Sequence, residues 1–320
     1  MIYRYSAVVV GLGRIGSSYL SHKTPRNHTA AYINNENIKM IAGIDPSTEA
    51  RREFKNNWGN EIPVFSSVVE MLNEGLRPDI VSICTTPEVM QKNIKDFHGY
   101  FPKAYFLEKP AAYTKSKCIE LLSMLDKMPV AVNYHRCWDP KHQFFLKNLN
   151  SKKIYTGRVL YSNGLANYAS HIIALLLQNF GKVNEITKIS NSCPPKNKKD
   201  ASLSFALGFD QGFSVIFQGV DNLNYEMLEI DFITNNGIYS LKSGGCRKRH
   251  EKPVDNLFYE NYTSLSDALE LQADGQVEGL QQAVEKIINF LDKKTDKLNC
   301  DLQLAIEVVN IINEVKNLNH

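Results

Sequence analysis

The sequence predicts an α/β protein with two domains. Residues 1–132 are expected to form a doubly wound parallel sheet, and residues 133–320 a second α/β domain with an open, mainly antiparallel sheet. A length of 320 residues exceeds the size at which one hydrophobic core keeps growing. Up to residue 132, short apolar runs alternate with helix-length amphipathic segments, which is typical of strand and helix units in a parallel sheet. Beyond it, alternating residues favour antiparallel strands.

The elements of the first domain follow this alternation. The expected strands are 7–10, 38–44, 80–85, 104–107 and 130–133. The expected helices lie near 14–22, 48–56, 66–74, 88–98 and 114–125. This order of elements predicts the doubly wound arrangement.

The second domain has a different pattern. Its expected elements are a helix after Asn133, a strand near 155–162, a helix near 168–179, several strands within 183–242, and two long helices near 276–292 and 301–316. Alternation over 225–232 followed by Asn235-Asn236-Gly237 predicts a strand and a hairpin turn. Residues 192–200 are expected to form a loop at the end of a strand.

Composition excludes several classes of protein. A net charge of +3 over the chain is too weak to predict nucleic-acid binding, which needs a concentrated basic face. The longest apolar run, 172–177, is shorter than the roughly 20 residues that span a bilayer, and no export signal precedes 7–10. Six cysteines without a Cys-x-x-Cys pair are typical of reduced thiols. We therefore expect a soluble, cytoplasmic protein with a small-molecule partner, with no metal site and no nucleic-acid or membrane partner.

A glycine-rich turn follows the first expected strand. The six residues GLGRIG at 11–16 link the apolar run at 7–10 to the first expected helix, which is the context that a dinucleotide-binding fingerprint requires. Gly11 permits a tight turn, Gly13 lets the backbone approach a pyrophosphate, and Gly16 lets helix and strand pack closely. Phosphate is then expected to meet the helix N-terminus.

An acidic residue closes the second expected strand. Asp45 can accept hydrogen bonds from the adenosine ribose hydroxyls, which favours NAD and makes NADP the less favoured cofactor. The interval after the glycines exceeds the usual ~20 residues because 21–27 insert a proline-containing excursion. Arg51 and Arg52 lie close behind and would soften the preference.

Further motifs accompany the glycine turn. They are Ile83-Cys84-Thr85-Thr86-Pro87, Glu108-Lys109-Pro110, Tyr134-His135-Arg136-Cys137-Trp138-Asp139-Pro140 and Asn167-Tyr168-Ala169-Ser170-His171. With them the chain resembles, over nearly its whole length, the Gfo/Idh/MocA oxidoreductases, named for glucose-fructose oxidoreductase and inositol dehydrogenase. The resemblance implies an N-terminal Rossmann domain and a C-terminal domain whose open sheet covers the nicotinamide. That sheet commonly forms oligomer contacts, which implies a homo-oligomer, a dimer or a tetramer.

The resemblance also implies hydride transfer between a substrate carbinol and the nicotinamide, a reaction that needs a positioned acid or base. Lys109 matches the family lysine and His171 the family histidine. The family usually places aspartate four residues before this histidine, where the chain has Asn167. Asparagine cannot take a proton but can orient a substrate hydroxyl. Family members associated with surface-glycan pathways also carry Asn-x-x-x-His at this position. A second departure from the family pattern is Gln91, where many relatives have a histidine.

The candidate site residues fall into three sets. The catalytic candidates are Lys109 and His171. The substrate-binding candidates are Asn167, Tyr134, His135, Arg136 and Tyr168. The cofactor-binding candidates are Gly11, Gly13, Arg14, Ile15, Gly16, Asp45, Thr85, Thr86, Pro87, Glu108 and Lys109. Alternatives remain open: Lys109 as a surface lysine, His171 as a histidine satisfied at a helix start, and His135 and Arg136 as ordinary residues between domains.

The short connection between 158–162 and His171 indicates how open the substrate pocket is. Few residues separate 158–162 from His171, where many relatives insert a long covering segment, so we expect an open pocket or a lid from a neighbouring subunit. The basic residues of 244–250 would meet a phosphate or form a solvated loop. The sequence thus predicts an NAD(H)-dependent oxidoreductase of a sugar hydroxyl or ketone, nucleotide-linked or phosphorylated, in bacterial glycan biosynthesis. The alternatives are a reductase of a non-sugar carbonyl or imine, similar to the biliverdin and dihydrodiol enzymes, and a non-catalytic NAD-binding homologue.

Overall fold

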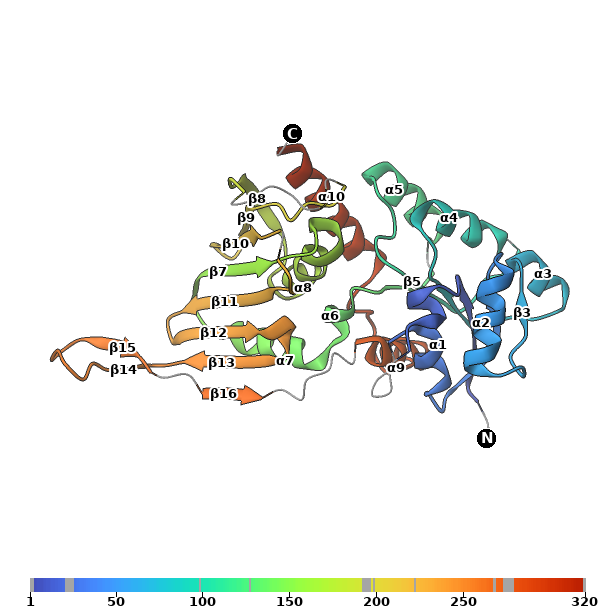
Figure 1. Cartoon of the computed structure of the whole chain (residues 1–320), viewed down its shortest axis with the longest axis horizontal. Helices are drawn as coiled ribbons and strands as arrows, with labels where there is room; N and C mark the ends of the chain where they lie inside the picture. Colours follow the sequence, from blue (N-terminus) through green and yellow to red (C-terminus); the bar gives the residue numbers. More distant parts are fainter. Residues whose placement is uncertain are drawn as a thin grey trace. The chain divides into compact units, whose positions relative to one another are not determined.

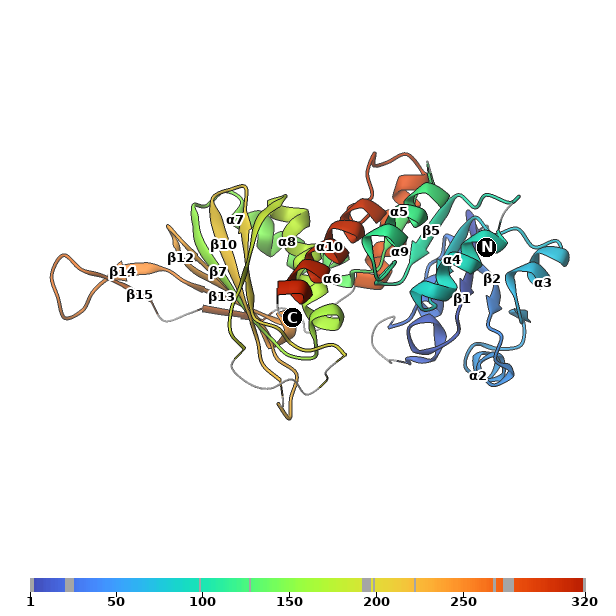
Figure 2. The same ribbon diagram turned by 90° about the horizontal axis from the view of Figure 1, so that it is seen from above.

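A computed structural model of the chain describes residues 3–20, 26–97, 99–126, 128–191, 197, 199–221, 223–266, 269–272 and 279–318. The chain forms two compact units (Figures 1 and 2). The first contains residues 1–138 and 278–309, and the second contains 139–277 and 310–320. Among the described residues, no helix is both long enough and apolar enough to cross a bilayer.

The first unit contains a six-stranded sheet with the order β3-β2-β1-β4-β5-β6, and every pair in it is parallel. Its strands are β1 Tyr5–Val10, β2 Ile38–Ile44, β3 Val64–Phe65, β4 Ile80–Ile83, β5 Ala104–Leu107 and β6 Val130–Val132. Apolar runs without alternation suit these strands, since helices cover both faces of a parallel sheet. The predicted doubly wound sheet is confirmed. The two-residue β3 was not predicted, because a strand so short leaves no periodic signal.

Helices connect these strands. They are α1 His28–Ile33, α2 Thr48–Trp58, α3 Val68–Asn73, α4 Pro87–Asp96, α5 Lys115–Met124 and α6 His135–Trp138. Local chemistry starts several of them: the side chains of Ser47, Ser67 and Thr114 each accept a backbone N–H in the first turn of α2, α3 and α5. Pro87 lies in the first turn of α4, where its missing N–H costs nothing.

The helix expected near 14–22 is wrong in its length. It is a single π-helical turn, Arg14–Ser18, in which Ser18 N–H donates to the Gly13 carbonyl at 3.1 Å. The chain becomes helical again at α1, which was not predicted and where the Asn27 side chain accepts Ala30 N–H at 2.7 Å. The proline-containing excursion falls largely on residues 21–25, outside the described part of the chain.

The predicted domain division after residue 132 also needs correction. The structure keeps α6 in the first unit and returns residues 278–309 to it, including α9 Gly279–Leu291 and the first half of α10 Leu302–Leu318. The apolar face of α9 is buried and packs on α1 and α6. A Cβ on Gly279 would lie 2.2 Å from the His135 carbonyl oxygen, so the two helix backbones touch. No change in composition marks this return, which explains why the sequence did not reveal it.

The second unit contains an eight-stranded sheet with the order β16-β13-β12-β11-β7-β10-β9-β8. Its strands are β7 Ile154–Tyr161, β8 Val183–Lys188, β9 Phe205–Phe209, β10 Phe213–Gly219, β11 Leu228–Thr234, β12 Gly237–Lys242, β13 Arg247–Glu251 and β16 Leu269–Gln272. Only β10 with β7 is a parallel pair, so the mainly antiparallel sheet is confirmed. Residues 235–236 link β11 to β12 in the predicted hairpin.

Strand β13 corrects the prediction for the basic segment 244–250. Residues 247–251 pair with β12 instead of forming a loop. Their charged side chains hide the strand from a hydropathy pattern. A further two-stranded ladder, β14 Pro253–Asp255 with β15 Thr263–Leu265, extends from this side of the sheet (Figure 1). Residues 192–196 and 198 of the expected loop lie outside the described residues.

Two helices cover one face of this sheet, α7 Pro140–Leu149 and α8 Ser170–Phe180 (Figure 2). Nearly every side chain of α8 is buried. At its end Phe180 contacts Phe209, Phe213 and Phe232 edge to face, with ring centroids 6.0, 5.2 and 5.6 Å away. These contacts fix the helix that carries His171 onto the sheet.

The return of α9 leads to a stability prediction. Ile287→Ala, a change at a residue that is 1% exposed, should lower the unfolding free energy of the first unit by about 2–5 kcal/mol through lost burial and a cavity. Both tryptophans of the chain, Trp58 and Trp138, lie in this unit, so denaturant titration followed by tryptophan fluorescence reports on it. The control Ile119→Ala, at a 55% exposed position on α5, should change the value by no more than about 0.5 kcal/mol. Equal losses in both variants would contradict the packing of α9 described above.

Candidate functional site

The register of the first sheet places five positions in a row at one edge. The last paired residues of β1, β2, β4, β5 and β6 are level with one another: Val10, Ile44, Ile83, Leu107 and Val132. The residues that follow them along this carboxyl edge are Gly11, Asp45, Cys84, Glu108 and Asn133. Strand order reverses between β1 and β4, and such a switch point is where open α/β sheets bind ligands.

Two of the three glycines in the turn are required by the packing of the protein itself. Gly11 has φ +91°, and a Cβ there would lie 2.9 Å from the Cys84 carbonyl oxygen. A Cβ on Gly16 would lie 1.9 Å from the Gly11 carbonyl oxygen. Only residues without a side chain fit this crossing of strand and turn.

Gly13 differs from the other two. A Cβ at this position would meet no atom within 4 Å, and its φ of −66° is open to any residue. Exposed Arg14 and half-buried Ile15 follow it. The space over Gly13 fits the close approach of a pyrophosphate to the backbone, as the sequence predicts. Because the helix beyond is one π turn, its first N–H groups, rather than a long helix dipole, would meet the phosphate.

Asp45 anchors the turn while its carboxylate remains half-exposed. One carboxylate oxygen accepts Leu12 N–H at 2.8 Å and the other accepts Ser47 N–H at 2.9 Å. Each oxygen has a further lone pair for a ribose hydroxyl. Arg51 donates to the backbone carbonyls of Asp45 and Pro46 at 2.6 and 2.9 Å, which places this cation beside the predicted ribose position.

The Thr-Thr-Pro segment leaves β4 next to the glycine turn. Thr86 is the residue before α4, and Thr85 Oγ1 accepts a hydrogen bond from Asn93 at 3.4 Å. Burial, and secondarily the negative charge of Glu108, raises the pKa of the Cys84 thiol, so the thiol stays neutral. Gln91 donates to the Lys117 carbonyl at 3.0 Å, a contact between α4 and the start of α5.

Lys109 follows the buried end of β5 and is itself half-buried. Before it, the Glu108 carboxylate accepts from Asn133 Nδ2 at 2.5 Å and from Lys109 N–H at 3.3 Å. His28 Nε2 lies 2.9 Å from the same carboxylate. The backbone of Lys109 is therefore held by a carboxylate that Asn133 and His28 also contact.

His28, Ser82 and Tyr32 are site residues that sequence reasoning missed. The Ser82 hydroxyl lies 2.8 Å from His28 Nδ1 and 2.6 Å from the Tyr32 hydroxyl. All three residues are fully buried. A histidine within the apolar pattern of α1 and a serine within apolar β4 were the available signals, because polar groups at buried positions need partners.

The substrate candidates of the first unit differ in exposure. Tyr134 is fully buried, and burial raises its pKa well above the ordinary value, with Cys300 and Cys137 among the groups around it. Its role as a substrate contact stays a prediction. Arg136 is 6% exposed and His135 is half-buried. Their role as substrate contacts stays a prediction.

The remaining candidates lie together in the second unit, on the turn before α8. This turn is also π-helical, Leu165–Ala169, and places exposed Asn167, half-buried Tyr168 and buried His171 within seven residues. Asn167 and His171 are four residues apart and so share one side of the helical segment. The Tyr168 hydroxyl lies 3.4 Å from a Glu226 carboxylate oxygen.

Asp200 is a further residue that the sequence did not reveal. Its carboxylate accepts Ala166 N–H at 2.8 Å and Asn167 N–H at 2.9 Å, satisfying the first donors of the helical segment. A Cβ on Gly164, which has φ +94°, would lie 2.2 Å from this carboxylate. Asp200 thus fixes the backbone from which Asn167 projects.

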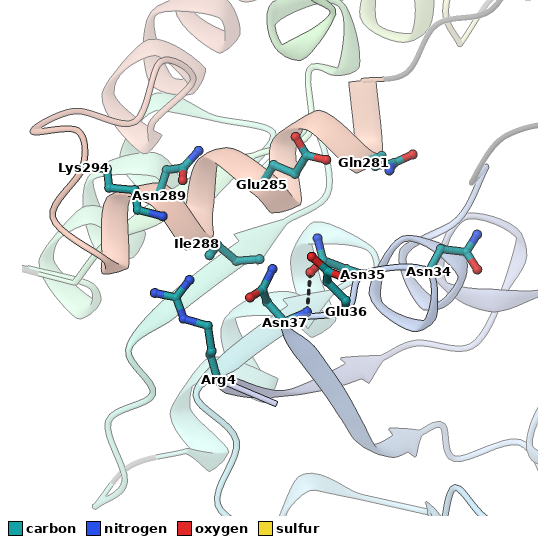
Figure 3. A pocket seen from close by; sticks show the side chains of 10 residues that line it. All are labelled: Arg4, Asn34, Asn35, Glu36, Asn37, Gln281, Glu285, Ile288, Asn289 and Lys294. Atoms are coloured by element: carbon teal, nitrogen blue, oxygen red, sulfur yellow. Dashed lines mark hydrogen bonds between the residues drawn. The ribbon is translucent and has the colours of Figure 1, made fainter. Parts of the chain in front are cut away.

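A polar hollow of about 400 Å³ also lies in the first unit (Figure 3). Arg4 and residues 34–37 line it from the starts of β1 and β2, and Gln281, Glu285 and Asn289 line it from α9. The amino ends of the strands form the edge opposite the glycine turn, so this hollow is separate from the candidate site.

A parallel sheet with a glycine turn at its switch point and an acidic residue closing the next strand defines a dinucleotide-binding α/β protein. Residues 5–135 match the sequence model of the oxidoreductase family with an NAD-binding Rossmann fold. This part of the chain is therefore similar to the Gfo/Idh/MocA oxidoreductase family. No curated protein matches the whole sequence closely enough to be compared.

Solved structures share the fold of the whole chain. A dehydrogenase from Chromobacterium violaceum superposes with a TM-score of 0.78 at 12% identity, over 99% of this chain and 95% of that one. An oxidoreductase from Agrobacterium radiobacter in complex with NAD+, L-tartaric acid and magnesium gives 0.76 at 15%, over 98% and 96%. UDP-N-acetylglucosamine 3-dehydrogenase from Acidithiobacillus ferrooxidans gives 0.71 at 14%, over 99% and 98%. Identities this low establish similarity of fold alone.

The open space over Gly13 predicts a separation of binding from stability. Gly13→Ala should leave the melting temperature unchanged, because the new methyl meets no protein atom, yet weaken NADH binding by roughly tenfold or more, about 1.4 kcal/mol. Fluorescence titration with NADH and thermal unfolding measure the two effects. Gly16→Ala is the matched control and should destabilise the fold, since its methyl would meet the Gly11 carbonyl. Unchanged NADH affinity in Gly13→Ala would exclude this backbone as the pyrophosphate contact.

Proposed function

We propose that the chain is an NAD(H)-dependent dehydrogenase or reductase acting on a sugar hydroxyl or ketone, with a nucleotide-linked or phosphorylated sugar as substrate. The observation that carries this proposal is Lys109 at the carboxyl edge of the sheet, on the same row of strand ends as the open glycine turn. A bound nicotinamide would supply the hydride acceptor or donor, and the residues of the chain must bind and orient the sugar and move one proton.

Lys109 and His171 are the proposed acid/base residues. The ammonium of Lys109 can donate a hydrogen bond to the reacting oxygen and stabilise the negative charge that develops there. His171 is the side chain that can take or give the proton near neutral pH. Asn167 can donate to and accept from a sugar hydroxyl but cannot exchange its protons as an acid. Because Lys109 and His171 supply the acid/base groups and Asn167 orients the sugar hydroxyl, the reaction does not need a carboxylate at position 167.

NAD is the proposed cofactor. The half-exposed Asp45 carboxylate favours ribose hydroxyls and repels a 2′-phosphate. Arg51 lies next to it, but this guanidinium already donates to two backbone carbonyls. The similarity in fold to an oxidoreductase in complex with NAD+ agrees with the proposed cofactor.

Two observations support a large, phosphate-bearing sugar. Only residues 162–164 separate β7 from the turn that carries Asn167, so this connection adds no covering segment. Lys248 on β13 is a cation of the second unit whose pKa is lowered, mainly by burial, and whose ammonium lies 5.4 Å from the Phe144 ring centre. A role in bacterial glycan biosynthesis, a cytoplasmic location and a homo-oligomer formed through the C-terminal sheet belong to the same proposal. A UDP-sugar dehydrogenase with the same fold agrees with the substrate class.

Substrate screening tests the proposal. Nicotinamide absorbance should change when the protein, with NAD+ or NADH and with the NADP pair as the comparison, meets a panel of free, phosphorylated and UDP-, CMP-, GDP- and dTDP-linked sugars and their ketones. We expect turnover with a nucleotide-linked or phosphorylated sugar, and faster turnover with NAD(H). A response confined to non-sugar carbonyls or imines would replace the substrate class. NADH binding with no turnover on any carbonyl would indicate a non-catalytic homologue.

The acid/base assignment leads to a prediction for two variants. Lys109→Ala and His171→Ala should each lower kcat by roughly 100-fold or more, because one proton-transfer or charge-stabilising group is lost, while the NADH Kd stays close to that of the wild type. Steady-state kinetics and NADH fluorescence measure these quantities. Lys39→Ala, at an exposed lysine on β2, is the control and should behave as wild type. Rates close to wild type in both active-site variants would refute the assignment.

A further inference from the structure

A chain of buried hydrogen bonds runs through the first unit and ends next to Lys109. The Tyr32 hydroxyl lies 2.6 Å from Ser82 Oγ, and Ser82 Oγ lies 2.8 Å from His28 Nδ1. His28 Nε2 lies 2.9 Å from a carboxylate oxygen of Glu108. Tyr32, Ser82 and His28 are 0% exposed and Glu108 is 8% exposed, so the chain is shielded from bulk water.

One arrangement of protons satisfies every member of this chain. With a neutral imidazole and an ionised carboxylate, His28 donates from Nε2 to Glu108 and accepts at Nδ1. Ser82 must then donate to Nδ1, which leaves its oxygen to accept from Tyr32 O–H. Burial raises the pKa of Tyr32, which keeps its proton for this bond. The donors all point toward Glu108.

Glu108 connects this hydrogen-bonded chain to Lys109. Its second carboxylate oxygen accepts Lys109 N–H at 3.3 Å, and its own N–H donates to the Ile83 carbonyl at 3.0 Å. Asn133, 3% exposed, donates to the first oxygen from the end of β6. The carboxylate is therefore fixed by a histidine from α1 and an amide from β6, and it fixes the backbone from which the lysine side chain starts.

We propose that His28 is a positioning residue for Lys109. By donating to Glu108 it holds the carboxylate in one place, and Glu108 in turn holds the backbone from which the Lys109 side chain starts. The proposal rests on the proposed function in so far as Lys109 acts on the substrate. His28 itself is fully buried and touches no substrate.

The surroundings of His28 and Glu108 contain few other groups that titrate. The Phe106 ring lies 4.4 Å from the His28 ring, centre to centre, and contributes no charge. Cys84 on the edge of β4 and Tyr134 after β6 both have a pKa raised mainly by burial and also by the charge of Glu108, so both stay neutral. Among the described residues named here, the only charges next to the chain are those of Glu108 and Lys109.

The test compares variants along the chain with a readout that needs no substrate. His28→Leu removes both hydrogen bonds at similar size, and His28→Gln retains one donor and one acceptor. Ser82→Ala removes the donor to Nδ1 and the acceptor for the Tyr32 hydroxyl, and Tyr32→Phe removes only the hydroxyl that lies farthest from Glu108. For each variant, kcat, KM and thermal stability are measured. Trace acetylation of Lys109 with an N-hydroxysuccinimide ester is followed by mass spectrometry, with exposed Lys39 as the internal reference.

We expect graded effects that decrease with distance from Lys109. His28→Leu should lower kcat roughly 10- to 100-fold with KM changed by less than about threefold, since a misplaced group reduces turnover more than binding. Lys109 should acetylate faster relative to Lys39, because the half-buried amine reaches the reagent more often when its backbone is no longer held in place. Ser82→Ala should change kcat and Lys109 acetylation in the same direction but less. His28→Gln should keep much of the kcat that His28→Leu loses, and the kcat of Tyr32→Phe should remain within about threefold of wild type.

Two results would overturn the proposal. One is wild-type kcat and Lys109 acetylation in His28→Leu. The other is a loss of activity that follows thermal stability equally in His28→Leu and Tyr32→Phe, with no change in acetylation, which would mean a purely structural role. If His28→Leu does not fold, Ser82→Ala decides by the same criteria. If the wild-type protein turns over no sugar, the proposed function fails, and acetylation alone decides the role of His28.

Discussion

The level ends of five parallel strands are the constraint on which the rest of the first unit depends. Backbone pairing aligns Val10, Ile44, Ile83, Leu107 and Val132, so whatever residue comes next in each strand is delivered to the same edge. Parallel ladders leave little freedom here, because a shift of one residue would turn every buried side chain to the other face. A tight turn, the carboxylates of Asp45 and Glu108, a thiol and an amide therefore become neighbours although they are far apart in sequence.

Close packing at this edge decides where a ligand can approach. Gly11 and Gly16 are in contact through backbone atoms, with no room for a side chain, whereas Gly13 faces open space. Next to it, the Glu108 carboxylate is almost fully buried and is surrounded by donors from α1, β6 and its own chain. A buried carboxylate with fewer partners would be costly and would tend to take up a proton. The fold thus leaves the Gly13 backbone exposed and holds the Lys109 backbone in place through a fixed carboxylate.

Much of this could be predicted from the sequence. The strands of the first sheet, its doubly wound order and the roles of Gly11 and Gly16 follow from patterns that are local in the chain. His28, Ser82 and Asp200 could not be predicted, because their partners are 80, 54 and 33 or 34 residues away, and no local signal identifies such pairs. The burial of Tyr134 could not be predicted for a related reason. A motif shows that a position matters, but burial decides whether its side chain faces a ligand or the core.

The boundary of the first unit was missed because an amphipathic helix does not encode which core it joins. Helix α9 has an apolar face that would suit either unit, and its packing on α1 and α6, with the close backbone contact of Gly279 with His135, ties it to the first. Similarly, the charged residues of β13 concealed a strand that pairs with β12. Both cases show tertiary contacts overriding a correct local pattern.

The return of residues 278–309 to the first unit has a consequence for how the chain is made. During synthesis, domains generally fold as they emerge, starting from the N-terminus. Here the first sheet leaves the ribosome complete while the helix that covers its α1 and α6 surface is still at least 140 residues from being translated. The dinucleotide-binding unit must wait, with that apolar surface exposed, until the whole second sheet has been synthesised. Neither unit can be produced as one uninterrupted piece of the chain.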